Sequence, residues 1–520
     1  MPHDSVFLTR GGDGELQDSP DTPHLWILYL HAATPSSPAQ HLHHCAAFPT
    51  HQQKHTFVFH HLHAPITQDL LRLRFDALII NYDFLRRIRT EERLESAMKF
   101  FSLFQKCAVK VALVQDDFTL GSYVDRFLDA MDVDYVYTAF PDKSKVLYPI
   151  SSSRVKFRQA MTGYVEETLV ERAALFSRPF QEREIDLGNR IFYMSPRTGR
   201  GGMLKGWLNE AFVGRARAAG LTVDFSTDPK ERLIGDNWLR FLGNTRFIVT
   251  AKGGSSVNDP NGDIRTCVQR YLQRDPEASF EAIEAECFPG EDGKHQFRAV
   301  GPRFLEAVAL GTVQIMPPDD YPGGLEPYVH YLPLNEDLSN ADEILAIMQD
   351  TERCEEIAKQ AYRRVVESEA FRYRTLVNRV FQDIEAHVVP RNWRGRFARR
   401  YQTWGNDKRL KRHLSSLGTA AAPLAELDTL SRAAFGTAVR KAARANMLDK
   451  ALAGVRSLAD SPRHSVLTTN WMPKRPAGRA LVTAVNHPDA AMRAAMLKLS
   501  RNFEAGQWDE AFVDSWGFCC

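Results

Sequence analysis

Short apolar runs alternate with helical segments through two long stretches of this sequence. In the first stretch, strands are predicted at 25–30, 56–59, 76–80, 109–114 and 135–138. In the second, they are predicted at 190–194, 222–225, 246–250, 313–316 and 330–334. Such alternation indicates parallel sheets, because the crossover between parallel strands is usually helical. A chain of 520 residues is too long to fold around one hydrophobic core. We therefore expect two α/β domains, each a parallel sheet with helices on both faces.

Local composition places the domain boundaries. Residues 1–23 are polar and rich in Gly and Asp, which predicts a disordered lead-in. The first domain is predicted at 24–183, ending in a helical segment that links it to the second domain at 184–388. Residues 389–520 are predicted to form a basic helical extension.

The overall composition is that of a globular protein, with 44% hydrophobic and 25% charged residues. The formal net charge of +2 indicates no particular partner. We find no apolar run long enough to span a membrane and no signal-peptide pattern. The seven cysteines are scattered without metal-ligand spacing, so we expect them to be reduced in a cytoplasmic protein. Cys519 and Cys520 are expected to be a free exposed pair.

The segment from Val300 to Ile315 predicts a helix followed by a buried strand. Pro302 is suited to the first turn of a helix, and Gly311 can end that helix in a left-handed conformation. Arg303 and Glu306 would then lie near the helix N-terminus, where backbone N–H groups and the helix dipole favour anions.

The pattern Glu306-Ala307-x-Ala309-x-Gly311-x-x-x-Ile315 resembles the nucleotide-sugar corner of glycosyltransferases with the B-type fold. These enzymes have two Rossmann-like domains that face a cleft, and a Glu at this place holds the ribose hydroxyls. The longer stretch, with the 323–325 turn and the 330–334 strand, is similar to bacterial glycosyltransferases of surface-polysaccharide gene clusters. An ordinary helix–strand unit with a solvated Glu is the alternative interpretation.

The resemblance covers residues 25–387 approximately and implies an acceptor domain followed by a nucleotide-sugar domain. It also implies that the last helix, at 371–387, crosses back to the first domain. The implied activity is transfer of a sugar from a nucleotide-sugar donor to a hydroxyl of a glycan or lipid-linked acceptor. No cofactor is expected, since the nucleotide sugar is a substrate.

Two glycine-rich segments of the second domain, at 197–205 and 253–255, are candidates to contact the donor. Glycine lets the backbone approach a phosphate, and Arg adds planar hydrogen-bond donors. The first segment lacks the Gly-Lys-Ser/Thr of a P-loop, and a flexible basic turn is the alternative. The resemblance implies that the second faces the sugar and diphosphate. The candidate residues in the two segments are Arg197, Arg200, Lys205, Gly253, Gly254 and Ser255.

One position departs from the best-known retaining enzymes of this fold. They carry a second Glu eight residues before the ribose-binding one, where this sequence has Arg298. Retention or inversion of the sugar is therefore not inferred. Arg298 and Arg303 are candidates to neutralise the leaving diphosphate, and without a suitable Asp-x-Asp we expect metal independence.

Carboxylates follow two predicted strands of the first domain, as Asp83 and as the pair Asp116 and Asp117. An Asp at this edge could act as general base toward an acceptor hydroxyl, or it could cap the next helix. The resemblance favours Asp116 and Asp117 as the catalytic pair.

Histidines are dense between His41 and His63. A metal site is one interpretation, but no Cys, Asp or Glu stands at recognised ligand spacing, and we favour a solvated loop. His61 remains an alternative base.

Basic and aromatic residues are interleaved at 391–412. This composition favours peripheral contact with the anionic inner face of a membrane. A solvated helix face and a nucleic-acid site are the alternative interpretations. A nucleotide-sugar epimerase of the same fold and a non-enzymatic ligand-binding or scaffold protein remain rival functions. A nicotinamide dehydrogenase is disfavoured, because no Gly-x-Gly-x-x-Gly follows a first strand.

Overall fold

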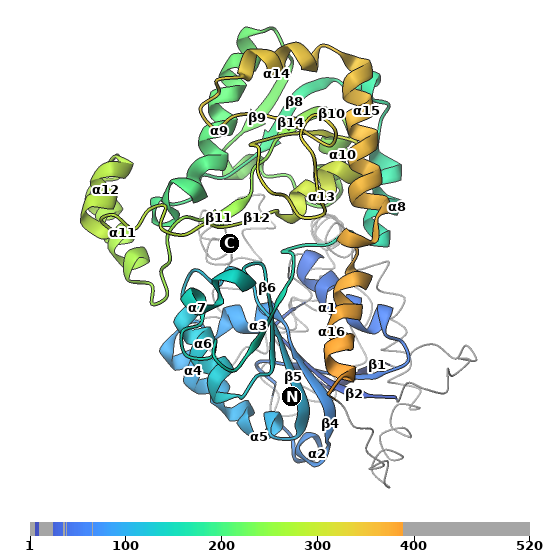
Figure 1. Cartoon of the computed structure of the whole chain (residues 1–520), viewed down its shortest axis with the longest axis vertical. Coiled ribbons are helices and arrows are strands. Elements are labelled where there is room, and N and C mark those ends of the chain that lie inside the picture. Colours follow the sequence, from blue (N-terminus) through green and yellow to red (C-terminus); the bar gives the residue numbers. More distant parts are fainter. Residues whose placement is uncertain (1–5, 10–23, 35–36, 38, 65, 388–520) are drawn as a thin grey trace, which may run out of the picture. The chain divides into compact units, whose positions relative to one another are not determined.

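The structure is a computed structural model, and it describes residues 6–9, 24–34, 37, 39–64 and 66–387 (Figure 1). Within these residues the chain forms two separate sheets of parallel strands flanked by helices. The predicted class, two Rossmann-like α/β domains, is therefore confirmed. The predicted extension at 389–520, with the basic segment 391–412 and the terminal cysteine pair, lies outside the described residues.

The first sheet has seven strands in the order β1-β3-β2-β4-β5-β6-β7. Their bounds are β1 Val6–Thr9, β2 Trp26–His31, β3 Thr56–His61, β4 Phe75–Ile80, β5 Cys107–Leu113, β6 Tyr135–Thr138 and β7 Lys156–Gln159. All neighbours pair in parallel except β1, which pairs antiparallel with β3. The five predicted strands are present.

The two edge strands of the first sheet were not predicted. Strand β1 falls within the segment 1–23 that was expected to be disordered. Strand β7 falls within the last part of the first domain, which was expected to be helical. Most residues of β7 are exposed, so it carries no apolar run that would identify it as a strand.

Alternate residues of the first sheet face two hydrophobic cores. Leu28 and Leu30 face the side covered by helices α3 (Tyr82–Arg87), α4 (Glu91–Ala97) and α6 (Gly121–Ala130). Ile27 and Tyr29 face the side that contains α1 (Ala39–His51) and α16 (Tyr373–Glu385). The chain thus returns to its first sheet after completing the second, as the resemblance implied.

The second sheet has five parallel strands in the order β14-β13-β10-β8-β9. Their bounds are β8 Ile185–Arg190, β9 Val223–Ser226, β10 Thr245–Val249, β13 Val313–Met316 and β14 Leu332–Pro333. The surrounding helices are α8 Glu167–Phe176, α9 Gly199–Ala218, α10 Asp236–Gly243, α13 Pro302–Ala309, α14 Ala341–Met348 and α15 Thr351–Tyr362. Helix α13 confirms the predicted 300–315 unit, and Gly311 has the left-handed φ of +69° expected after its last turn.

Two predictions at the start of the second sheet were wrong. The strand expected at 190–194 lies earlier and ends at Arg190, while Phe192, Tyr193 and Met194 are exposed beyond it. The glycine-rich segment 199–205, expected to be a loop, is the first part of α9. Glycine lowers helix propensity, but the close contacts of this helix outweigh that cost.

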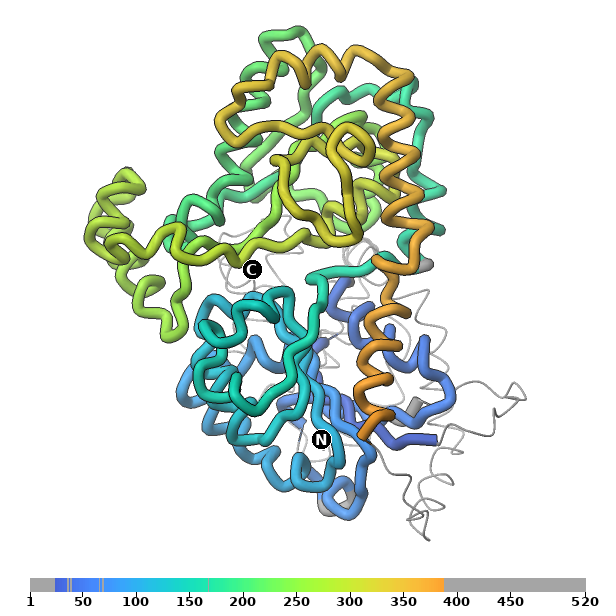
Figure 2. The backbone as a smooth tube through the Cα atoms, in the orientation of Figure 1, coloured from blue at the N-terminus to red at the C-terminus, as the bar shows by residue number. Residues whose placement is uncertain are grey.

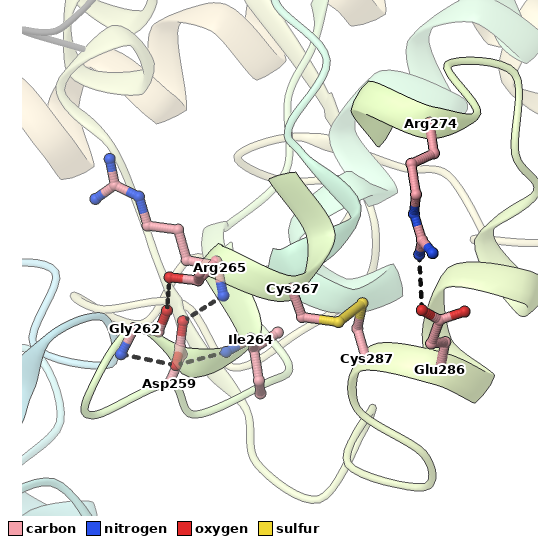
Figure 3. Close-up of a disulfide and its surroundings, with 9 residues drawn as sticks. Asp259, Gly262, Ile264, Arg265, Cys267, Arg274, Glu286 and Cys287 are labelled. Carbon is pink, nitrogen blue, oxygen red and sulfur yellow. Dashed lines mark hydrogen bonds and ion pairs between the residues drawn. A yellow bond between two sulfur atoms is a disulfide. The ribbon is translucent and has the colours of Figure 1, made fainter. Parts of the chain in front are cut away.

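Between β10 and α13 the chain forms a separate two-stranded antiparallel sheet of β11 (Gly253–Ser255) and β12 (Phe297–Ala299). The segment that joins these two strands projects away from the rest of the second domain (Figure 2). Between them lie α11 (Asp263–Arg274) and α12 (Phe280–Cys287), which we call the excursion. A disulfide joins Cys267 to Cys287 (Figure 3), so the prediction that all cysteines are reduced was wrong. The two helices bring these cysteines together across 20 residues, which sequence spacing does not reveal.

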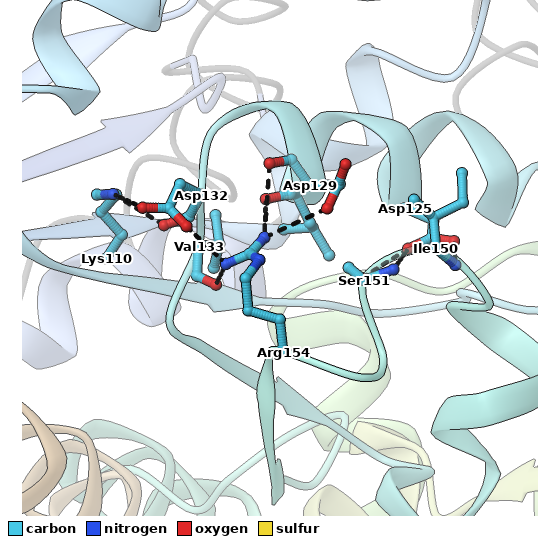
Figure 4. Close-up of polar contacts among 9 residues, drawn as sticks. Lys110, Asp125, Asp129, Asp132, Val133, Ile150, Ser151 and Arg154 are labelled. Atoms are coloured by element: carbon cyan, nitrogen blue, oxygen red, sulfur yellow. Dashed lines mark hydrogen bonds and ion pairs between the residues drawn. The ribbon is translucent and has the colours of Figure 1, made fainter.

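Polar contacts hold the loops at the amino-terminal ends of β6 and β7 (Figure 4). Arg154 donates to the carbonyl of Val133 at 2.9 Å and pairs with Asp132 at 2.9 Å. The carboxylate of Asp125 on α6 accepts from the backbone and hydroxyl of Ser151 at 3.0 and 2.6 Å. These contacts lie at the edge opposite the one where parallel sheets bind ligands, so we regard them as structural.

Among the described residues, none of the helices combines the length and hydrophobicity that crossing a lipid bilayer requires.

Candidate functional site

The second sheet presents a ligand edge at the carboxyl ends of β8, β10 and β13. In open parallel α/β sheets, ligands bind at this edge, where the helices that follow the strands begin. Helices α9 and α13 both start here, and they carry four of the predicted donor-binding residues, which are Arg200, Lys205, Arg303 and Glu306.

Glu306 is held on α13 by one tryptophan. The indole N–H of Trp238 donates to Oε2 of Glu306 at 2.8 Å. Within the described chain, the second oxygen of this carboxylate has no hydrogen-bond partner. Burial raises the pKa of Glu306, and the Trp238 hydrogen bond and the charges of Arg303 and Arg172 oppose that rise. Glu306 can therefore accept hydrogen bonds from a ligand through one fixed oxygen.

Lys205 is a mostly buried cation in the second turn of α9. No carboxylate or other acceptor contacts its ammonium group among the residues that the structure describes. Burial, and after it the nearby charge of Arg303, lower the pKa of Lys205 to about 8. An ammonium group in this setting lacks the anion that normally accompanies a buried charge.

Arg303 lies beside both Lys205 and Glu306. Its guanidinium lies 4.9 Å from the centre of the Trp238 ring and donates to the backbone carbonyl of Arg190. Trp238 thus contacts the guanidinium of Arg303 through its ring and the carboxylate of Glu306 through its N–H. We call Lys205, Trp238, Arg303 and Glu306 the α9–α13 cluster.

Arg197 is a further cation at this edge, just before α9. Burial and then the neighbouring Arg265 lower its pKa, whereas Asp259 and Asp116 act in the opposite direction. The carboxylate of Asp259 is itself held by backbone N–H groups of the excursion, including that of Arg265 at 2.9 Å (Figure 3). Arg197 makes no direct hydrogen bond within the described part of the chain, so its donors remain available.

Two of the predicted cations are already paired. Arg200 makes ion pairs with Glu281, Glu284 and Asp292 at 3.1, 3.2 and 3.0 Å. Arg298 lies on β12 and pairs with Glu336 at 3.3 Å. Within the described residues Lys205 and Arg197 have no such ion pair, which separates them from Arg200 and Arg298 as candidates for an anionic ligand.

Several residues of the two predicted glycine segments are used in packing, whereas a Cβ added at Gly253 would meet no atom within 4 Å. The backbone N–H groups of Arg200 and Gly201 are taken by Asp292 and Ser256 at 3.1 and 2.9 Å. Gly253, Gly254 and Ser255 form β11, and the hydroxyl of Ser255 lies 3.0 Å from the carbonyl of Thr198. The start of α9 is therefore closed by the protein itself, and the predicted phosphate contact by these glycines gains no support.

The predicted catalytic carboxylates have different surroundings. Asp117 is buried and accepts 2.6 Å hydrogen bonds from the hydroxyls of Thr138 and Tyr148. Burial raises the pKa of Asp117, and its enclosure favours a structural role. Asp116 is exposed, and its φ of +53° places it in a strained left-handed conformation of the kind found at functional sites. Asp116 is therefore the better candidate for a base.

The alternative base, His61, ends β3. Its Nδ1 accepts from the backbone N–H of His63 at 3.2 Å, and its ring lies 5.3 Å from that of His31. His61 thus lies at the ligand edge of the first sheet, as predicted, within a group of histidines.

Sequence reasoning missed the part that Trp238 plays. Trp238 lies on α10, and nothing in the sequence connects it to Glu306, which lies 68 residues later. Sequence reasoning also gave no role to Arg172, whose charge acts on Glu306. An indole between Asp236 and Arg240 was the only available signal, and it is too common to indicate a site.

The chain matches no protein-family model and no curated protein. Among solved structures, it is similar to an alpha-glucosyltransferase in complex with UDP and DNA containing an HMU base. The match covers 70% of this chain and 100% of that one, with 11% identity and a TM-score of 0.39. It is also similar to HepE of Anabaena in complex with UDP-glucose, over 70% and 100% of the two chains, with 10% identity and a TM-score of 0.37.

A third similar structure is the GtfA/B complex, matched over 61% of this chain and 59% of that one, with 13% identity and a TM-score of 0.33. With scores and identities this low, the likenesses support no conclusion about the activity of this chain.

Proposed function

We propose that this protein transfers a sugar from a nucleotide-sugar donor to a hydroxyl of a glycan or lipid-linked acceptor. The observation that carries the proposal is Lys205, a mostly buried cation without an anion among the described residues, at the ligand edge of a parallel sheet. A diphosphate is an anion that would complete this site.

Each member of the α9–α13 cluster has a role in this proposal. Lys205 and Arg303 neutralise the charge that grows on the nucleoside diphosphate as it leaves the sugar. The unpaired oxygen of Glu306 accepts hydrogen bonds from the ribose hydroxyls, while Trp238 fixes the carboxylate from its other side. Two cations at the diphosphate supply the charge that a metal would otherwise provide, which is the basis for proposing metal independence of the transfer.

The acceptor hydroxyl must lose its proton as it attacks the sugar. We assign this step to Asp116, which is exposed beyond β5, with His61 as the alternative base. The proposed peripheral membrane contact through 391–412 would bring a lipid-linked acceptor close to the enzyme.

A thermal-shift screen with uridine, guanosine and cytidine diphosphates and their sugars tests the donor site, since a ligand that binds the folded state raises the melting temperature. The compounds of one of these three nucleosides should raise the melting temperature of the wild type. Lys205→Met and Glu306→Ala should reduce this rise, and the exposed control Lys230→Met should leave the rise unchanged. A shift that is equal in Lys205→Met and wild type would contradict the proposal.

Turnover distinguishes transfer from the rival functions. A transferase releases nucleoside diphosphate faster when an acceptor is present. Conversion of the donor to a second nucleotide sugar without acceptor would indicate an epimerase. Binding without turnover under both conditions would indicate a ligand-binding protein.

A further inference from the structure

Three potential metal ligands meet on the first sheet, in elements that are distant in sequence. His31 ends β2, Cys45 lies in α1 and Asp83 lies in the first turn of α3. One ligand atom from each residue lies within 4.8 Å of the other two. Cys45 and Asp83 are 9% and 5% exposed, so the group is largely closed to solvent.

The carboxylate of Asp83 lacks the partners that a buried charge requires. Neither of its oxygens, nor Nδ1 of His31, has a hydrogen-bond partner in the described part of the chain. The backbone N–H groups of Ala32 and Phe84 face the carboxylate and partly offset the effect of burial on its pKa. They do not reach hydrogen-bond geometry with it, however. Buried polar atoms of this kind are rare and call for an unseen partner.

Asn81 is arranged as a supporting residue for the thiol. Its side-chain oxygen accepts from the backbone N–H of Tyr82 at 2.8 Å, which fixes the orientation of the amide. The amide nitrogen then donates to Sγ of Cys45 at 2.9 Å. Hydrogen bonds to ligating atoms orient them and stabilise negative charge on the sulfur.

We propose that His31, Cys45 and Asp83 bind one Zn²⁺ ion, with a fourth position open to water. Nitrogen, sulfur and carboxylate oxygen together suit zinc, whereas Mg²⁺ and Ca²⁺ prefer oxygen alone. Ligand atoms of tetrahedral zinc stand about 3.5 Å apart, so side-chain movements on the order of 1 Å would complete the site. The bound ion deprotonates the thiol, and the proton is released to solvent.

This site differs from the metal site considered for the His41–His63 run. Only Cys45 lies in that run, and its partners come from the ends of two other elements. A Zn²⁺ ion here would connect β2, α1 and α3, and it takes no part in holding the donor diphosphate.

The test measures zinc binding by the full-length protein. After dialysis against Zn²⁺ and removal of excess, wild type should retain about one ion per chain. Cys45→Ser and Asp83→Asn should each weaken binding roughly tenfold or more. Cys107→Ser, a buried free thiol elsewhere in the first domain, is the matched control and should bind as wild type does. Co²⁺-loaded protein should show a thiolate charge-transfer band that Cys45→Ser removes.

Several outcomes would overturn the proposal. They are absence of retained zinc in wild type, unchanged binding in both ligand variants, and binding that is lost only in Cys519→Ser/Cys520→Ser. If a ligand variant fails to fold by circular dichroism, His31→Gln decides the question, because His31 is less buried than the other two.

Discussion

At the scale of single residues, Lys205 distinguishes this site from an ordinary α/β edge. The sequence named Lys205, Arg303 and Glu306 as candidates, and the structure brings them together. The sequence could not show that Arg200 is paired, because the acids that bind Arg200 lie 81 to 92 positions away. It also could not separate Asp116 from Asp117, since only tertiary structure encloses the latter with Thr138 and Tyr148.

Lys205→Met should weaken binding of the nucleoside diphosphate roughly tenfold to a hundredfold, because a hydrogen bond to a charged group is lost. Isothermal titration calorimetry measures this, with Lys230→Met as control. The same variant should be more stable than wild type without ligand, because it removes an unpaired buried charge. Equal affinities would mean that Lys205 does not contact the ligand.

The pH dependence of Lys205 provides a second prediction. Its folded-state pKa is lowered to about 8, below the unfolded value. The unfolded state therefore binds more protons between about pH 8 and 10.5, and this residue's contribution makes stability rise with pH in that window. In urea unfolding, the free energy of unfolding of Lys205→Met should exceed that of the wild type below this window. The difference should become smaller as the pH rises through the window. Nucleotide affinity should fall several-fold over the same range in wild type only.

At the scale of elements, glycine spacing was misread because it has two physical explanations. A loop that approaches a phosphate and a helix that approaches another strand both exclude side chains. At Gly202 a Cβ would lie 2.3 Å from Oγ1 of Thr198 and 2.8 Å from the carbonyl oxygen of Gly254. The strands of the second sheet were predicted well where they are apolar and poorly at β8, whose sequence is mixed.

Gly202→Ala should therefore destabilise the protein by about 1–3 kcal/mol through overpacking. Gly214→Ala lies in the same helix with no atom within 4 Å of an added Cβ. That control should stabilise the protein by about 0.5–1 kcal/mol, as expected for alanine in an exposed helix. Urea denaturation compares the two, and similar effects of both substitutions would show that α9 does not need its glycines for packing.

At the scale of the whole described chain, the order of strands and helices followed from the sequence because buried parallel strands are apolar. The sequence did not predict the edge strands, the disulfide or the exact bounds of the helices and strands. Each of these depends on contacts between segments that are distant in the sequence. The return of α16 to the first sheet is one such contact. The carboxylate of Asp383 on this helix accepts from Tyr137 at 2.8 Å and from Arg158 at 2.9 Å.

Asp383→Ala should lower the stability of the first domain by about 1–3 kcal/mol, because it leaves the Tyr137 hydroxyl without its acceptor. Asp342→Ala is the control, since that carboxylate is 93% exposed in its surface ion pair. Hydrogen exchange should localise the change to β6, β7 and α16. A change confined to the second sheet would contradict this account of how the chain is held together.

A crystal structure with the nucleotide sugar selected by the thermal-shift screen would locate the donor on the second sheet. We expect the diphosphate within hydrogen-bond distance of Lys205 and Arg303, and the ribose hydroxyls at the oxygen of Glu306 that Trp238 does not bind. A nucleotide bound elsewhere, with the α9–α13 cluster unchanged, would contradict it.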